Sequence, residues 1–181
     1  MDDSLSQIIT IVLLFVFLGT LLVPFALFFV YVGFQNTKRK RIRERVLASD
    51  ARLASNPLRL PARHASQARF KSFFKILPWE SAGLIFVAPE GITYAGELMS
   101  GAPVSVSFRP EQVRWLGKQA FPNGAVSWFE VVTPAGSHYF TSETGFFILG
   151  SNRTTKAICD QLAAGRTQAA TPPAQAPPNF N

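Results

Sequence analysis

The chain has 181 residues, with 18 lysine and arginine residues against 11 acidic residues and a net charge of +7. This length allows about one compact domain plus extensions, since such domains take roughly 100 to 150 residues. The charge is concentrated between residues 38 and 63, which hold nine basic and two acidic residues. A single cysteine, Cys159, excludes an intramolecular disulfide and a CxxC metal or redox site.

The first long segment, residues 8–34, contains no charged residue. As a helix with a rise of about 1.5 Å per residue it would extend about 40 Å, more than the roughly 30 Å hydrocarbon core of a bilayer. A secretory signal peptide would have a basic start and a shorter apolar run, whereas this chain begins Met-Asp-Asp-Ser. We therefore expect a transmembrane helix at residues 8–34, preceded by a short outer tail at residues 1–7.

A basic run follows the expected span directly. It contains Lys38, Arg39, Lys40, Arg41, Arg43 and Arg45, against the single acidic Glu44. The positive-inside bias therefore predicts a single-pass inner (plasma) membrane protein with its N-terminus outside and its C-terminal domain in the cytoplasm. Such a run also attracts anionic lipid. Nucleic acid is not an expected partner, because the run abuts a membrane.

Residues 35–66 are expected to connect the span to a domain. Good helix formers accompany the basic run, which allows the helix to continue beyond the membrane. Pro57 and Pro61 then disfavour helix at the residues before them. We expect a basic juxtamembrane helix followed by an extended, proline-containing tether.

The stretch RFKSFFKILPWE, residues 69–80, has an apolar stripe at the spacing i, i+3, i+4, i+7. The stripe consists of Phe70, Phe73, Phe74 and Leu77, and Lys71 and Lys75 lie off it. This spacing predicts a short amphipathic helix with a basic flank. The stripe fits either the domain core or a membrane surface, where both lysines would reach lipid phosphates. FFKIL also fits a first strand. Core packing is the favoured interpretation, because a small sheet domain needs its aromatic residues inside.

Six β-rich runs follow, separated by turn signals. They cover residues 82–88, 92–97, 104–108, 112–117, 125–132 and 137–142. The pattern predicts an antiparallel meander. Three turns, APEG, FPNG and TPAG, place Gly91, Gly124 and Gly136 two residues after a proline. These glycines are predicted to adopt the left-handed conformation of tight hairpins with a bulge.

The domain is predicted to end in a helix within SNRTTKAICDQLAAG. Ser151 or Asn152 is a candidate N-cap, Ile158 and Leu162 share one face, and Gly165 is a candidate C-terminal cap.

These features place the β domain at residues 67–166. The remaining residues, 167–181, are rich in proline and alanine and nearly free of apolar side chains. Such a composition predicts disorder unless a partner orders the tail.

A meander of about seven short strands closed by one C-terminal helix resembles the pleckstrin-homology (PH)-like superfold, including GRAM-like and bacterial PH-like domains. The resemblance is carried by residues 83–97, the strand with Val113 and Trp115, residues 127–142 and the final helix. It implies a small mainly-β (α+β) domain, a partly open barrel capped by the helix, and a binding module for lipid head groups or protein partners. Lipid-binding relatives carry basic residues in the first turn, whereas this chain has APEG there. An SH3-like or other open barrel is the alternative.

Residues that carry catalysis or ligate metals are sparse. His64 and His138 belong to no metal-spaced pair, and GxSxG, P-loop, GxGxxG and HExxH motifs are absent from the sequence. We expect structural or solvent-exposed histidines, with no catalytic, cofactor-binding or metal-binding residues.

Anchor and domain together predict a function in binding. We expect a non-enzymatic accessory or scaffolding subunit of a larger bacterial-type membrane complex (respiratory, photosynthetic or transport), with protein partners. The alternative is a membrane-anchored sensor of anionic lipid head groups that uses the basic run, Lys71 and Lys75.

Overall fold

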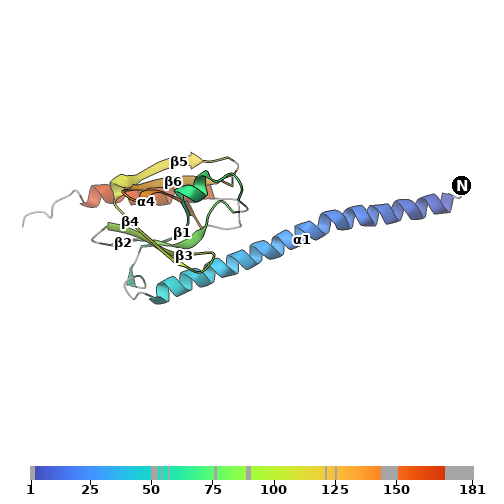
Figure 1. Cartoon of the computed structure of the whole chain (residues 1–181), viewed down its shortest axis with the longest axis horizontal. Coiled ribbons are helices and arrows are strands. Elements are labelled where there is room, and N and C mark those ends of the chain that lie inside the picture. The colour runs from blue at the N-terminus through green and yellow to red at the C-terminus, as the bar shows by residue number, and fades with distance from the viewer. Residues whose placement is uncertain are drawn as a thin grey trace, which may run out of the picture. The chain divides into compact units, whose positions relative to one another are not determined.

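The computed structural model describes residues 3–49, 53, 55, 56, 58–75, 77–88, 91–120, 122–124, 126–143 and 151–169. The chain forms two compact units, residues 1–40 and 41–181. Figure 1 shows a long first helix, a curled sheet and a final helix beside the sheet. This arrangement confirms the predicted class, an apolar N-terminal helix followed by a small α+β domain.

Helix α1, Asp3–Ser49, contains the whole expected span. Its apolar side chains from Ile8 to Phe34 lie largely exposed in the first unit. By length and composition, α1 is the one candidate membrane-spanning helix among the described residues. The helix also runs through the basic segment to Ser49, as the helix formers of that segment allow.

Seven antiparallel strands form one sheet. They are β1 (Arg59–Ser66), β2 (Ser81–Ala88), β3 (Gly91–Leu98), β4 (Pro103–Phe108), β5 (Val113–Lys118), β6 (Ser127–Thr133) and β7 (Gly136–Ser142). Their order across the sheet is β4-β3-β2-β1-β7-β6-β5. The six predicted runs correspond to β2 through β7. The sheet curls into a half-barrel whose edge strands are β4 and β5 (Figure 1).

Strand β1 corrects the expected tether. Residues 59–66 are extended, as the prolines imply, but they lie at the centre of the sheet rather than outside it. His64 pairs with Ser81 of β2 on one side and with Phe140 of β7 on the other. Pro61 lies just past the last β1–β7 pair, Ala62 with Ser142, so its missing amide N–H interrupts no pair of that ladder, and its carbonyl accepts from Glu143 N–H at 3.0 Å.

The core fills the inside of the curled sheet. Tyr94, Phe129 and Phe140 are fully buried there with Ile158 and Leu162 of helix α4, Ser151–Ala169. Burial of this set by α4 confirms the predicted apolar face of the final helix. Cys159 lies in the same core.

Helix α4 is longer than predicted. It continues through Gly165 to Ala169, so Gly165 does not cap it and the first three residues of the expected tail are helical. The candidate cap Asn152 lies inside the helix and accepts a hydrogen bond from Ser127 Oγ at 2.7 Å. The rest of the expected tail, residues 170–181, lies outside the described residues.

The outer face of the sheet is covered by the last turns of α1, which belong to the second unit. Ile42 and Val46 are buried against Leu84 of β2 in a second apolar cluster. Two ion pairs flank it: Arg43 to Glu143 at 2.5 Å, and Arg45 to Glu97 at 2.6 Å.

The turn glycines adopt the predicted backbone. The φ angles of Gly91, Gly124 and Gly136 are 141°, 75° and 129°, a region that disfavours residues with a Cβ atom. At Gly124, an added Cβ would also lie 2.8 Å from Pro78 Cγ, so this turn packs closely on the segment before β2.

The amphipathic helix expected over residues 70–77 is wrong beyond its first turn. Helix α3 covers only Gln67–Lys71, because Ser72 turns extended with φ −63° and ψ 133°. Ser66 caps its N-terminus by accepting from Arg69 N–H at 3.3 Å. The expectation that FFKIL forms a first strand is also wrong, because Phe73, Phe74, Lys75 and Leu77 belong to no strand.

Candidate functional sites

Residues 72–75 form an exposed loop, which we call the aromatic loop. The side chains of Phe73 and Phe74 are 58% and 89% exposed and meet edge to face, with ring centroids 5.1 Å apart. The two ends of the predicted stripe behave differently. Phe70 stacks on Tyr139 with ring centroids 3.8 Å apart, and Leu77 is buried. Leu77 is thus buried and Phe70 half-buried, whereas the two central phenylalanines lie outside the core.

Lys75 holds the aromatic loop closed. Its Nζ donates to the carbonyl oxygens of Arg69 and Phe70 at 2.9 and 2.8 Å, and to Asn123 Oδ1 at 2.5 Å. The first two acceptors are carbonyls of the last turn of α3, where a cation is favoured. Partial burial, and then the charge of Arg69, lower the pKa of Lys75. Lys75 therefore does not project toward lipid phosphates as the sequence suggested.

The other predicted basic residues differ in their surroundings. Arg43 and Arg45 are paired with carboxylates of the domain. Arg39 donates to the side chain of Asn36. Lys71 and Arg41 are exposed, and Lys38 and Lys40 belong to the helical unit of residues 1–40.

The two histidines meet inside the domain. His64 Nε2 lies 3.0 Å from His138 Nδ1, and His64 Nδ1 lies 2.9 Å from Ser81 Oγ. Ser81 Oγ lies 3.0 Å from Tyr94 Oη, which extends the chain of polar groups into the core. The expectation of structural histidines fits this arrangement, but their contact could not be read from two positions 74 residues apart.

Burial controls the protonation of His64, His138 and Tyr94. It lowers the pKa of His64 to about 3, with a smaller contribution from His138. It also lowers the pKa of His138, against the opposing charge of Glu80, and raises the pKa of Tyr94. At pH 7 the two histidines and Tyr94 are therefore neutral. Ser81 lies between His64 and Tyr94, and no carboxylate among the described residues is hydrogen-bonded to either histidine.

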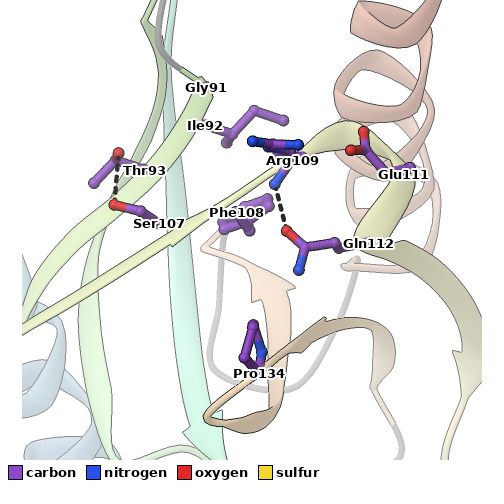
Figure 2. Close-up of a pocket in the computed structure, with 9 residues that line it drawn as sticks. All are labelled: Gly91, Ile92, Thr93, Ser107, Phe108, Arg109, Glu111, Gln112 and Pro134. Atoms are coloured by element: carbon purple, nitrogen blue, oxygen red, sulfur yellow. Dashed lines mark hydrogen bonds between the residues drawn. The ribbon is translucent and has the colours of Figure 1, made fainter.

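A cavity of about 510 Å³ opens at one end of the half-barrel (Figure 2). Gly91, Ile92, Thr93, Ser107, Phe108, Arg109, Glu111, Gln112 and Pro134 line it. Gln112 is occupied: its Oε1 accepts from Arg109 N–H and its Nε2 donates to Val132 O, both at 2.7 Å. The lining thus offers one guanidinium and one carboxylate, and no nucleophile beside a general base.

A second hollow of about 580 Å³, which we call the β4 groove, lies along an edge of the sheet. It is bounded by the last turns of α1 and by β3 and β4, and its lining is mainly apolar. Arg45, Val46, Ala48, Ser49, Ala95, Gly96, Glu97, Pro103, Val104 and Ser105 form it. Sequence reasoning missed this groove because its walls come from segments about 50 residues apart.

Within the part of the chain that the structure describes, the outer side of β4 pairs with no other strand. Leu98 N–H donates to Ala102 O at 2.8 Å, which makes this a hydrogen-bonded pair. Such pairs alternate along an antiparallel ladder. The register pairs Ala95 with Ser105 and Thr93 with Ser107, so Ser105 and Ser107 direct N–H and C=O away from β3. Both serines are exposed.

Comparisons with known proteins do not assign any of these sites. No protein family, curated protein or solved structure matches the chain. Among the described residues, no group of three or more His, Cys, Asp or Glu side chains is placed to hold a metal ion.

Proposed function

We propose that this chain is a membrane-anchored binding module, an accessory or scaffolding subunit that contacts a protein partner in a larger bacterial-type membrane complex, and not an enzyme. The seven-stranded sheet closed by α4 supports the resemblance to PH-like domains. That class consists mainly of binding modules, but fold alone does not define function. The proposal therefore depends on a surface.

The β4 groove is the observation that carries this proposal. An edge strand with outward N–H and C=O groups accepts an extended peptide as an added strand, and adjoining pockets take alternate side chains of that peptide. Ser105 and Ser107 supply the open backbone, and Ala48, Ala95 and Pro103 are among the apolar residues that line the adjoining groove. Natural proteins protect long open edges. Here Pro103 protects only the first position of β4. This supports pairing of a partner strand along the rest of β4.

A pair of substitutions at one position tests this surface. Ser105→Pro removes the outward N–H, whereas Ser105→Ala keeps it. Pro103 already occupies the same outward register two residues earlier, so a second proline suits the strand. After gentle detergent extraction, we expect the parent and Ser105→Ala to migrate on native gels with a co-purifying protein, and Ser105→Pro to lose it. Migration of the parent as an isolated monomer, or retention of the partner by folded Ser105→Pro, would contradict the proposal.

The proposed topology places the domain in the cytoplasm. It is supported by the six basic residues between Lys38 and Arg45 against Asp2 and Asp3 at the start of the chain. A reporter enzyme that works only in the cytoplasm should then be active when it is fused after Asn181. Activity on the outer side would overturn both the orientation and the reducing surroundings expected for Cys159.

A further inference from the structure

We propose that the aromatic loop inserts Phe73 and Phe74 into the boundary between head groups and acyl chains of the bilayer that holds α1. This contact is separate from the β4 groove and does not depend on a protein partner. It assigns the membrane contact of the domain to two apolar side chains rather than to a basic surface.

The exposure of these two side chains is the first argument. Outside α1, the other exposed large apolar residues that the structure describes, Val87, Trp115 and Val132, are at most 40% exposed. Phe74 is 89% exposed and Phe73 58%. Scattered, partly exposed apolar residues are normal on protein surfaces, but two adjacent, strongly exposed aromatic rings at a loop tip are a binding feature.

The hydrogen bonding of the loop is the second argument. Entry into a lipid interface is unfavourable for a polar group that loses water without gaining a partner. Lys75 Nζ has three oxygen acceptors from the protein, and Ser72 N–H donates to Ala68 O at 3.1 Å and Arg69 O at 3.3 Å. The loop can therefore approach apolar surroundings with its ammonium group already bonded. The same bonds fix both ends of the loop on the domain before contact, which reduces the ordering cost of binding.

The anchor is the third argument, and it favours lipid over a protein as the occupant. The candidate span in α1 and the domain belong to one chain, so a bilayer is always present at high effective concentration. Two side chains are then enough for a contact that would be too weak for a free domain. Lys71, exposed two residues before Phe73, adds attraction to anionic head groups. Because only this one cation of the segment projects, insertion should depend little on salt.

Photocrosslinking of the full chain tests the proposal. Benzoylphenylalanine in place of Phe74 is compared with the same group in place of Val132, an exposed apolar residue of β6. The chain is reconstituted into phosphatidylcholine vesicles with and without phosphatidylglycerol, and is also irradiated in the membranes of the expressing cells. We expect lipid adducts at position 74 in all three settings, several-fold above position 132 and nearly unchanged at high salt. Adding Phe73→Ser should lower the yield at position 74.

Three results would overturn the proposal: adduct at position 74 no higher than at position 132, adduct that disappears at high salt, or a protein adduct that replaces lipid in cell membranes. Ser105→Pro serves as the independent control. Its removal of a partner from the β4 groove should leave the lipid adduct at position 74 unchanged, so failure of the proposed function and failure of this inference are distinguishable.

Discussion

Strand β1 and the aromatic loop, separated by only five residues of α3, invert the usual distribution of side chains. In β1, Arg63 and His64 are 2% exposed, whereas in the loop Phe73 and Phe74 point outward. Arg63 lies with its guanidinium carbon 4.2 Å from the centre of the Trp79 ring, and His64 contacts Ser81 and His138. The buried polar groups therefore have partners inside the domain.

Phe73 and Phe74 differ from these β1 residues, because the hydrogen bonds of the aromatic loop hold them away from the core. A buried polar side chain is stable when it is hydrogen-bonded, and an apolar side chain stays exposed when its backbone is held away from the core. Strand β1 therefore builds the domain, whereas the aromatic loop is available for contact with something else. Four measurements test this difference.

Lowering the pH should have the largest effect on stability, because it acts on the buried His64 of β1. The folded domain holds the pKa of His64 at about 3, below its ordinary value of 6.5, because of burial. Between these values the unfolded chain binds the proton and the folded domain does not, so stability is complete above about pH 6.5 and is lost as the pH falls toward 3. The loss is on the order of 4 kcal/mol.

The acid loss can be measured as the denaturant midpoint in detergent at several pH values, followed by tryptophan fluorescence. Trp79, Trp115 and Trp128, the three tryptophans of the chain, all belong to the second unit. A His64→Asn variant keeps every carboxylate and should show a shallower pH dependence. Equal slopes for parent and variant would remove His64 from the account.

Truncation of the same side chain at neutral pH should have the next largest effect. His64→Ala removes ring contacts with Tyr94 and Phe140. It also removes the hydrogen-bond partner of His138 Nδ1 and one of the two partners of Ser81 Oγ, which keeps Tyr94 Oη. We expect a loss of about 2 to 3 kcal/mol from the cavity and the orphaned polar groups. Arg59→Ala, at the exposed start of β1, is the matched control and should change stability by less than about 0.5 kcal/mol. Similar losses for both would contradict the central position of β1.

Loss of the lysine that closes the aromatic loop should have a smaller effect. Lys75→Met keeps the length of the side chain and removes three hydrogen bonds to Arg69, Phe70 and Asn123. We expect a cost of about 1 to 2 kcal/mol and faster amide hydrogen exchange in residues 72–75. Lys71→Met, four residues earlier and exposed, is the control. If amide hydrogen exchange in residues 72–75 is unchanged in Lys75→Met, the hydrogen bonds of Lys75 do not hold the aromatic loop.

Much of the sheet could be predicted from local patterns. The runs that form β2 to β7 alternate or are β-branched and are bounded by turns with proline and glycine, and the periodicity of Ile158 and Leu162 marks α4. β1 could not be predicted this way. Its residues include Pro61, Arg63 and His64, and they become a central strand only by pairing with β2 and β7, which lie farther along the chain.

The candidate sites depended even more on contacts between distant residues. The spacing of Phe70, Phe73, Phe74 and Leu77 fits a helix as well as any amphipathic pattern. What ends that helix is the bonding of Lys75 to the carbonyls of α3 and to Asn123, 48 residues away. The β4 groove likewise joins α1 to β3 and β4. No local pattern in the sequence signals either one.

The most direct test of the contrast is the free energy of unfolding of a Phe73→Ser/Phe74→Ser variant of the full chain in detergent. Because both side chains lie outside the core, we expect a value within about 0.5 kcal/mol of the parent, with unchanged tryptophan emission. If both were core residues, each truncation would cost about 3 to 5 kcal/mol and would unfold the domain. A loss of that size would mean that Phe73 and Phe74 are core residues, and it would contradict their place in an exposed loop.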